Sequence, residues 1–147
     1  MFRFDLQAGD AAPVAKDLSE RTPVANVDGY TVTLSSLSLQ TGSSAEIAVH
    51  IAKGGKPATD VHPYLGELAH AVFLNAGDLS YVHVHPVLPG MVMGSATTAV
   101  YSNDEMIVSP NTLLHVTVHE PGTYKLWFQF HAGSSLHVAS FVLTAKP

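Results

Sequence analysis

Short stretches in which apolar and polar residues alternate follow one another from residue 30 to the end of the chain. Such alternation is typical of half-buried β-strands, because successive side chains of a strand point to opposite faces. The pattern predicts seven strands, over residues 30–34, 45–52, 69–75, 79–85, 112–119, 123–130 and 136–145. Turns rich in Gly, Pro, Asn and Asp separate these segments, and no convincing amphipathic helix is present. The sequence therefore predicts an all-β fold, an immunoglobulin-like β-sandwich of about seven to eight antiparallel strands.

The segment before the first strand has a different character. Residues 1–27 show no sustained period and are predicted to form an N-terminal arm, extended or partly disordered, with one candidate strand in residues 1–6. The sandwich domain is predicted to span residues 28–147, and we expect the metal site described below to lie in it. Within this domain, Tyr124 follows Pro121-Gly122-Thr123 at the start of a strongly alternating strand, which predicts the corner tyrosine of immunoglobulin-like domains.

Composition narrows the function classes. The 147 residues carry a formal net charge of −5 and no Lys/Arg run, so a nucleic-acid partner is not expected. No apolar run approaches the roughly 20 residues of a membrane helix, and a secretory leader is not visible, so an export signal would have to lie outside the printed sequence. Cysteine is absent, which excludes thiolate metal sites and cysteine nucleophiles. Nine histidines are well above ordinary usage, and their placement is the main functional clue.

Four separate strand ends carry these histidines toward one another. In an immunoglobulin-like topology, residues 69–75 pair with residues 79–85 and with residues 123–130, which also pair with residues 136–145. This pairing is predicted to bring five imidazoles to one end of one sheet, namely His70, His83, His85, His131 and His137. His83 and His85 are two positions apart and share a face of their strand. The sequence thus predicts a metal site built from His83, His85 and His137, with His70 and His131 as candidates for the fourth ligand.

The ligand chemistry favours copper, with zinc as the second choice. Imidazole suits copper, zinc, nickel and iron. The segment of residues 86–111 leaves from the same end of the sheet and carries Met91 and Met93, whose thioethers would favour copper if they were ligands and would otherwise pack on the core. The preceding loop contributes Asp60 and His62, which are predicted to be ligands or supporting groups or, for Asp60, a turn former.

Three motifs carry a resemblance to a known group of domains. They are Pro63-Tyr64-Leu65-Gly66 with His70 after it, His83-Val84-His85-Pro86, and Pro121-Gly122-Thr123-Tyr124-Lys125-Leu126-Trp127. Over residues 30–144 the chain resembles bacterial secreted immunoglobulin-like domains found in the cell envelope beside copper or heavy-metal handling proteins. The resemblance implies a secreted, periplasmic or cell-envelope location and another copper-handling protein as a partner. It also implies His70, His83, His85 and His137 as the matched positions, whereas His131 rests on topology alone.

A second resemblance is to the cupins, which would be metalloenzymes. Gly77 followed by His83-x-His85 is similar to the first cupin metal motif, and Pro110 followed by His115 is similar to the second. This resemblance implies His83, His85 and His115 as ligands and dioxygenase or isomerase chemistry. The chain departs from the cupin pattern because no glutamate follows His85 within the next five residues.

The third alternative is a scaffold or adhesion module whose histidines bind no metal. In that case Trp127, which has the opposite parity to the core residues of its strand, would belong to a partner surface. The remaining histidines, at positions 50, 115 and 119, are predicted to face solvent. The leading hypothesis is a non-enzymatic, extracytoplasmic domain that sequesters or transfers copper through its histidine cluster.

Overall fold

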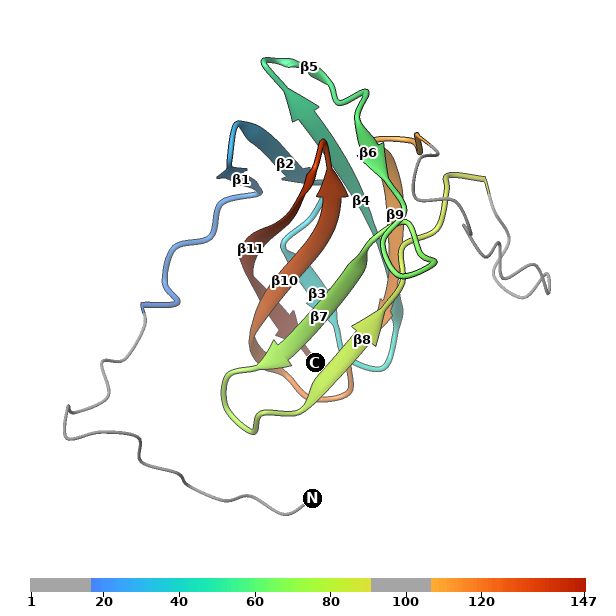
Figure 1. Ribbon diagram of the computed structural model, residues 1–147. Coiled ribbons are helices and arrows are strands. Elements are labelled where there is room, and N and C mark those ends of the chain that lie inside the picture. Colours follow the sequence, from blue (N-terminus) through green and yellow to red (C-terminus); the bar gives the residue numbers. More distant parts are fainter. Residues whose placement is uncertain (1–16, 91–106) are drawn as a thin grey trace, which may run out of the picture.

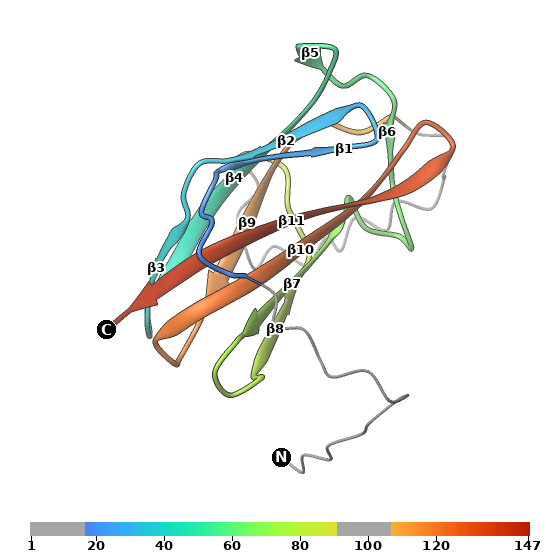
Figure 2. The ribbon, with the colours of Figure 1, turned by 90° about the vertical axis from the view of Figure 1, so that its left-hand side faces the viewer.

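Two β-sheets pack face to face in the computed structural model, which describes residues 17–90 and 107–147 (Figures 1 and 2). The first sheet contains β1 (Val24–Val27), β2 (Tyr30–Leu34), β4 (Ser44–Lys53), β5 (Lys56–Pro57) and β9 (Asn111–Thr117). The second sheet contains β3 (Ser38–Gln40), β6 (Val61–His62), β7 (His70–Asn75), β8 (Tyr81–Val84), β10 (Gly122–Ala132) and β11 (Ser135–Lys146). The predicted β-sandwich is confirmed.

Each of the seven segments predicted from alternation contains an observed strand. The four strands that the pattern missed are β1, β3, β5 and β6, which have only 4, 3, 2 and 2 residues. Strands of two or three residues are too short to show a period of two, and β1 lies in the segment predicted as an arm. In addition, β3 pairs with the end of β11 in parallel, whereas the prediction contained antiparallel pairs only.

The strand order of the second sheet decides where the histidines go. Strand β10 is central, with β11 on one side and β7 on the other, and β8 pairs with the outer edge of β7. The three pairs that these four strands form with one another are all antiparallel, as predicted. The short strand β6 pairs with the last residues of β10, beyond the start of β7. The start of β7, the end of β8 and the end of β10 therefore lie at the same end of this sheet (Figure 1).

The core lies between the inner faces of the two sheets. From β10 it receives Tyr124, Leu126, Phe128 and Phe130, which are all buried. Strands of the first sheet supply the facing aliphatic side chains, among them Val32, Ile47, Val49, Ile51 and Leu114. Trp127 has the opposite parity and is 37 % exposed on the outer face, as predicted. Alternation along β10 thus separates an aromatic inner row from a polar outer row.

The sheet begins earlier in the chain than the predicted domain boundary at residue 28. Val24 to Val27 form β1, which pairs with β2 through a turn in which Asp28 and Gly29 have positive φ. The strand predicted in residues 1–6 lies outside the described residues. None of the described residues forms a helix long and apolar enough to cross a membrane.

The predicted corner tyrosine is confirmed. The ring of Tyr124 is buried, and its hydroxyl donates a hydrogen bond to the backbone carbonyl of Glu120 at 2.8 Å. This bond joins the turn before β10 to the first buried side chain of that strand. It therefore helps to set the point at which the inner aromatic row of β10 begins.

Replacing Tyr124 with Phe should lower the free energy of unfolding by about 1 kcal/mol, because the ring is retained and one intramolecular hydrogen bond is lost. Urea denaturation followed by tryptophan fluorescence would measure this change. An unchanged midpoint would show that water replaces the bond without cost.

A second polar contact ties the first sheet to the segment that enters β6. One carboxylate oxygen of Asp60 accepts hydrogen bonds from the Tyr30 hydroxyl at 2.8 Å and from Lys53 Nζ at 2.7 Å. Burial by itself would raise the pKa of Asp60, but the hydrogen bonds from Lys53 and Tyr30 outweigh it and lower this pKa below 3.8. A carboxyl group whose pKa is lowered by folding stabilises the fold above its unfolded pKa and loses this contribution as the pH falls.

The Asp60→Asn variant should therefore be less stable than the wild type at pH 7, and the difference should shrink as the pH is lowered from about 5 to 3. Urea denaturation of both proteins across this range would measure the difference. A gap of constant size would show that the charge of Asp60 contributes nothing. Other carboxylates titrate in both proteins and cancel in the comparison.

Candidate metal centre

Three imidazoles meet on the outer face of the second sheet, at the edge formed by β7 and β8. His70 is the first residue of β7, His83 lies in β8, and His85 follows the last residue of β8. His83 stands opposite Val72, and both have the parity of the outer face. Continued for one more residue, the antiparallel register brings His85 beside His70. We call His70, His83 and His85 the histidine triad.

The spacing of the triad matches what one metal ion requires. One ring nitrogen from each residue lies within 4.8 Å of the other two. The closest contact joins His70 Nδ1 to His83 Nε2 at 3.3 Å. Two nitrogens that each bind one ion at about 2.0–2.1 Å with a tetrahedral angle are about 3.3 Å apart. The backbone therefore already holds His70 and His83 at a ligand-to-ligand distance.

Acceptors beside the triad orient two of its rings. His70 Nε2 lies 3.0 Å from the backbone carbonyl of Tyr64, to which it donates its proton, so Nδ1 is left with the lone pair. His85 Nδ1 lies 3.3 Å from a carboxylate oxygen of Glu67, which favours a proton on Nδ1 and a lone pair on Nε2. Metal-binding histidines almost always donate their other N–H to a carbonyl or a carboxylate in this way. The two lone pairs thus point toward the other rings of the triad, and that of His70 Nδ1 accepts a hydrogen bond from His83 Nε2, whose proton a bound ion would replace.

A tight turn supplies both acceptors. Tyr64 and Glu67 exchange backbone hydrogen bonds of 2.8 and 3.2 Å across Leu65 and Gly66. Both central residues have positive φ, 53° for Leu65 and 81° for Gly66, as in the turns that join the tightest hairpins. Leu65 is 75 % exposed, so no burial compensates for its left-handed backbone conformation. Strain of this kind concentrates at functional sites, which agrees with the position of the turn beside the triad.

Glu67 was missed by sequence reasoning. It lies between the Pro63–Gly66 motif and His70, but no local pattern marks it as a partner of His85. Its role depends on the turn, which folds residue 67 back onto the triad. The combination of Leu-Gly at the turn centre with a carboxylate directly after it is the one signal that points to such a role.

The structure places His137 away from the triad, which corrects its assignment as a third ligand. In β11 it stands opposite Phe130 and shares the inner parity, so its ring lies in the core and is only 6 % exposed. One ring nitrogen is 2.9 Å from the Asp28 carboxylate and the other is 3.2 Å from the Ala132 carbonyl. The topology predicted from the sequence located the correct end of the sheet. The parity of β11, however, turns the imidazole of His137 to the inner face, opposite to the triad.

Comparison with known protein families assigns the chain to one of them. A family model described as a domain of unknown function, DUF8832, matches residues 25–147. The chain belongs to this family. No curated protein and no solved structure matches the chain significantly.

In this DUF8832 domain, His131 also lies outside the triad. It occupies the outer face of β10, two residues beyond Gln129, which stands opposite His70. Its cross-strand neighbour is His62 of β6. The outer face is therefore the predicted one, but His131 joins another imidazole rather than the triad.

The other predicted groups have separate surroundings. Asp60 is engaged with Tyr30 and Lys53, as described above, and Met91 and Met93 lie outside the described residues. His115 lies on β9 in the first sheet, with Glu46 at 3.8 Å. The ligand set that the cupin resemblance implies is therefore not assembled, because His115 is on the other sheet from His83 and His85.

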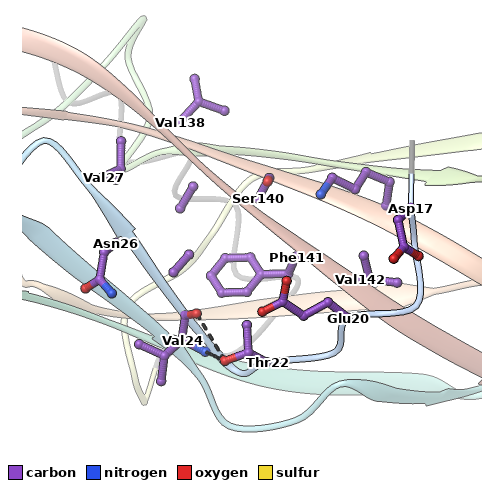
Figure 3. A pocket seen from close by; sticks show the side chains of 13 residues that line it. Asp17, Glu20, Thr22, Val24, Asn26, Val27, Val138, Ser140, Phe141 and Val142 are labelled. Carbon is purple, nitrogen blue, oxygen red and sulfur yellow. Dashed lines mark hydrogen bonds between the residues drawn. The ribbon is translucent and has the colours of Figure 1, made fainter. Parts of the chain in front are cut away.

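A hollow of about 390 Å³ lies between β11 and the segment that leads into and forms β1 (Figure 3). Asp17 and Glu20 approach it from the first segment, and Phe141 and Ser140 from β11. No histidine lines this hollow. The histidine triad thus lies at the β7–β8 edge and not in this hollow.

The His137→Ala variant separates a structural role from a ligand role. Removing a buried ring that packs between Tyr30 and Phe130 should lower the free energy of unfolding by about 2–4 kcal/mol. Copper affinity, measured by calorimetry at a temperature where the variant is folded, should stay within twofold of the wild type. A tenfold or greater loss in the folded variant would restore His137 as a ligand.

Proposed function

We propose that this domain binds copper through the histidine triad and sequesters or transfers the ion outside the cytoplasm. The observation that carries the proposal is the triad itself. Three imidazoles converge within 4.8 Å, and a carbonyl and a carboxylate fix the protons of two of them on the nitrogens that face away. Among residues 17–90 and 107–147, no other group of three histidine, cysteine or acidic residues meets in this way.

The ligand set favours copper over zinc. It consists of nitrogen donors alone, and cysteine is absent from the whole sequence. For a given nitrogen site, affinity rises along the divalent series to Cu²⁺ and falls again at Zn²⁺. Zinc remains the second choice, because three imidazoles with an open fourth position are also a common zinc arrangement.

The position of the triad favours exchange of the ion. His83 and His85 are exposed, the first in β8 and the second directly after it, and β8 is an edge strand of its sheet among the described residues. Three protein ligands leave at least one coordination position for water or for a ligand from a partner. An ion held there can be reached directly by a second copper-handling protein, whereas structural metal sites are closed.

The cellular location and the partner are proposed from the sequence. The motifs around His70, His83 and Tyr124 resemble those of secreted immunoglobulin-like domains found beside copper and heavy-metal handling proteins, and all three lie in the described sandwich. A secreted, periplasmic or cell-envelope setting is consistent with an exposed copper site.

Addition of Cu(II) to the metal-free protein should raise its melting temperature by mass action, by about 5–10 °C at a free copper concentration 100-fold above Kd. Replacing both His83 and His85 with Ala should remove most of this rise, together with the part of the nitrogen hyperfine pattern in the electron paramagnetic resonance spectrum that comes from the triad. Differential scanning calorimetry and spectroscopy on the same samples would measure both effects.

The matched control replaces His115 and His119 with Ala. This variant also loses two imidazoles, but both belong to β9 or its end, in the other sheet. It should keep the full copper response. If the His83/His85 variant binds copper as tightly as the wild type, the proposed function is wrong, and a response that depends on His115 would favour the cupin-like ligand set instead.

A further inference from the structure

A second group of imidazoles lies on the same outer face as the triad. His62 of β6 and His131 of β10 stand directly opposite each other in an antiparallel pair. Their ring centroids are 5.7 Å apart, and the ring planes are inclined by 58°. Side chains at directly opposed positions have Cβ atoms about 4.5–5.5 Å apart, which is close enough for both to contact one ion. We call these two residues the histidine pair.

Within residues 17–90 and 107–147, the ring nitrogens of the pair have no hydrogen-bond partner. His62 Nδ1 is buried and makes no hydrogen bond. No hydrogen bond or ion pair joins the ring of His131 to any residue in the described part of the chain; its contact is the ring of His62. A buried nitrogen without a partner costs about 1–3 kcal/mol, so such atoms call for a ligand or an ion. The rings of His50, His70, His85 and His137 all have a hydrogen-bond or ion-pair partner. His115 Nε2 is also buried without a hydrogen bond, but it lies 3.8 Å from the Glu46 carboxylate and has no second imidazole of the described residues beside it that could share an ion.

The pair is a close neighbour of the triad. Gln129 stands opposite His70, and His131 lies two residues further along the same face of β10, about 7 Å away along the strand. The turn residue Tyr64 lies beside both groups. Its carbonyl accepts the proton of His70, and it lines, with Pro63, Leu65 and His131, a hollow of about 310 Å³.

From this geometry we propose that His62 and His131 form a second transition-metal site, weaker than the triad and beside it. The inference rests on the proposed function for the identity of the ion, which is copper. The existence of the site rests on the geometry of the pair alone. With two protein ligands in place of three, the pair binds the ion less tightly and releases it faster. The outer face of the second sheet thus holds two ions per chain, one at the β7–β8 edge and one between β6 and β10.

The test is a stoichiometric titration with Cu(II) of four full-length proteins. They are the wild type, the triad variant His83→Ala/His85→Ala, the pair variant His62→Ala/His131→Ala, and the combination of all four substitutions, which gives the background. The wild type should bind two ions above background, in two steps that differ at least tenfold in affinity. The triad variant should keep only the weaker step and the pair variant only the tighter one.

The two proposals fail in different ways. If the pair variant is folded and binds the same two ions as the wild type, or if the wild type binds one ion and the pair variant keeps it, the second site does not exist. If the triad variant instead binds the same ions with the same affinities as the wild type, the proposed function is wrong, and the proposal of a site at the histidine pair is not affected. The His131→Ala substitution alone, at a surface position of the sheet, should also remove the weaker step.

A measurement on the wild-type protein tests the second site without depending on whether the variants fold. Paramagnetic Cu(II) broadens the nuclear magnetic resonance signals of nearby imidazoles. Broadening falls steeply with distance, so the first equivalent should broaden the ring signals of His70, His83 and His85 most strongly, and the signals of His62 and His131 should broaden further with the second. Signals of His62 and His131 that do not broaden further between one and two equivalents would overturn the second site.

Discussion

The parity of β10 is the constraint on which the rest of the structure depends. Its inner row contains three side chains with no exposure, Leu126, Phe128 and Phe130, packed between the sheets. A slip of the strand by one residue would carry this row into water and the polar row into the core. At roughly 25 cal/mol per Å² of apolar area, no set of surface contacts could offset such a change. The registers of β7 and β11 on β10 follow from it, and so does the face on which every histidine of this sheet lies.

This constraint builds a metal site without disturbing the core. The triad uses only outer-face positions of β7 and β8, whose inner-face neighbours Ala71 and Phe73 are buried. Strands hold ligands more rigidly than loops do, so little ordering is left for the ion to impose. Of the three non-glycine residues with positive φ among the described residues, Asp28, Leu65 and Leu79, it is Leu65 that lies in the turn supplying acceptors to His70 and His85. The other two lie in the β1–β2 and β7–β8 turns, away from the ligand nitrogens.

Histidine side chains have three different roles at this one end of the sheet. His137 is buried with both ring nitrogens bonded to oxygen, and it fastens the β1–β2 turn to the β10–β11 hairpin. In the triad, His70 has one nitrogen fixed by a carbonyl and the other directed at a second imidazole. His62 has a buried nitrogen without a protein partner. Whether a histidine has a structural role or a ligand role is therefore decided by the hydrogen-bond acceptors around its ring, and not by the presence of the histidine alone.

The sequence by itself determined the sandwich, the seven longer strands, the corner tyrosine and the end of the sheet to which the histidines go, because alternation and antiparallel pairing are local rules. His83 and His85 were predictable for the same reason, since two residues two apart in a strand share a face. Only the tertiary structure decided that His137 points inward, that His131 meets His62, and that Glu67 turns back onto His85. These outcomes depend on the phase of one strand relative to another and on the path of a tight turn, and neither quantity is encoded in the periodicity of a single segment.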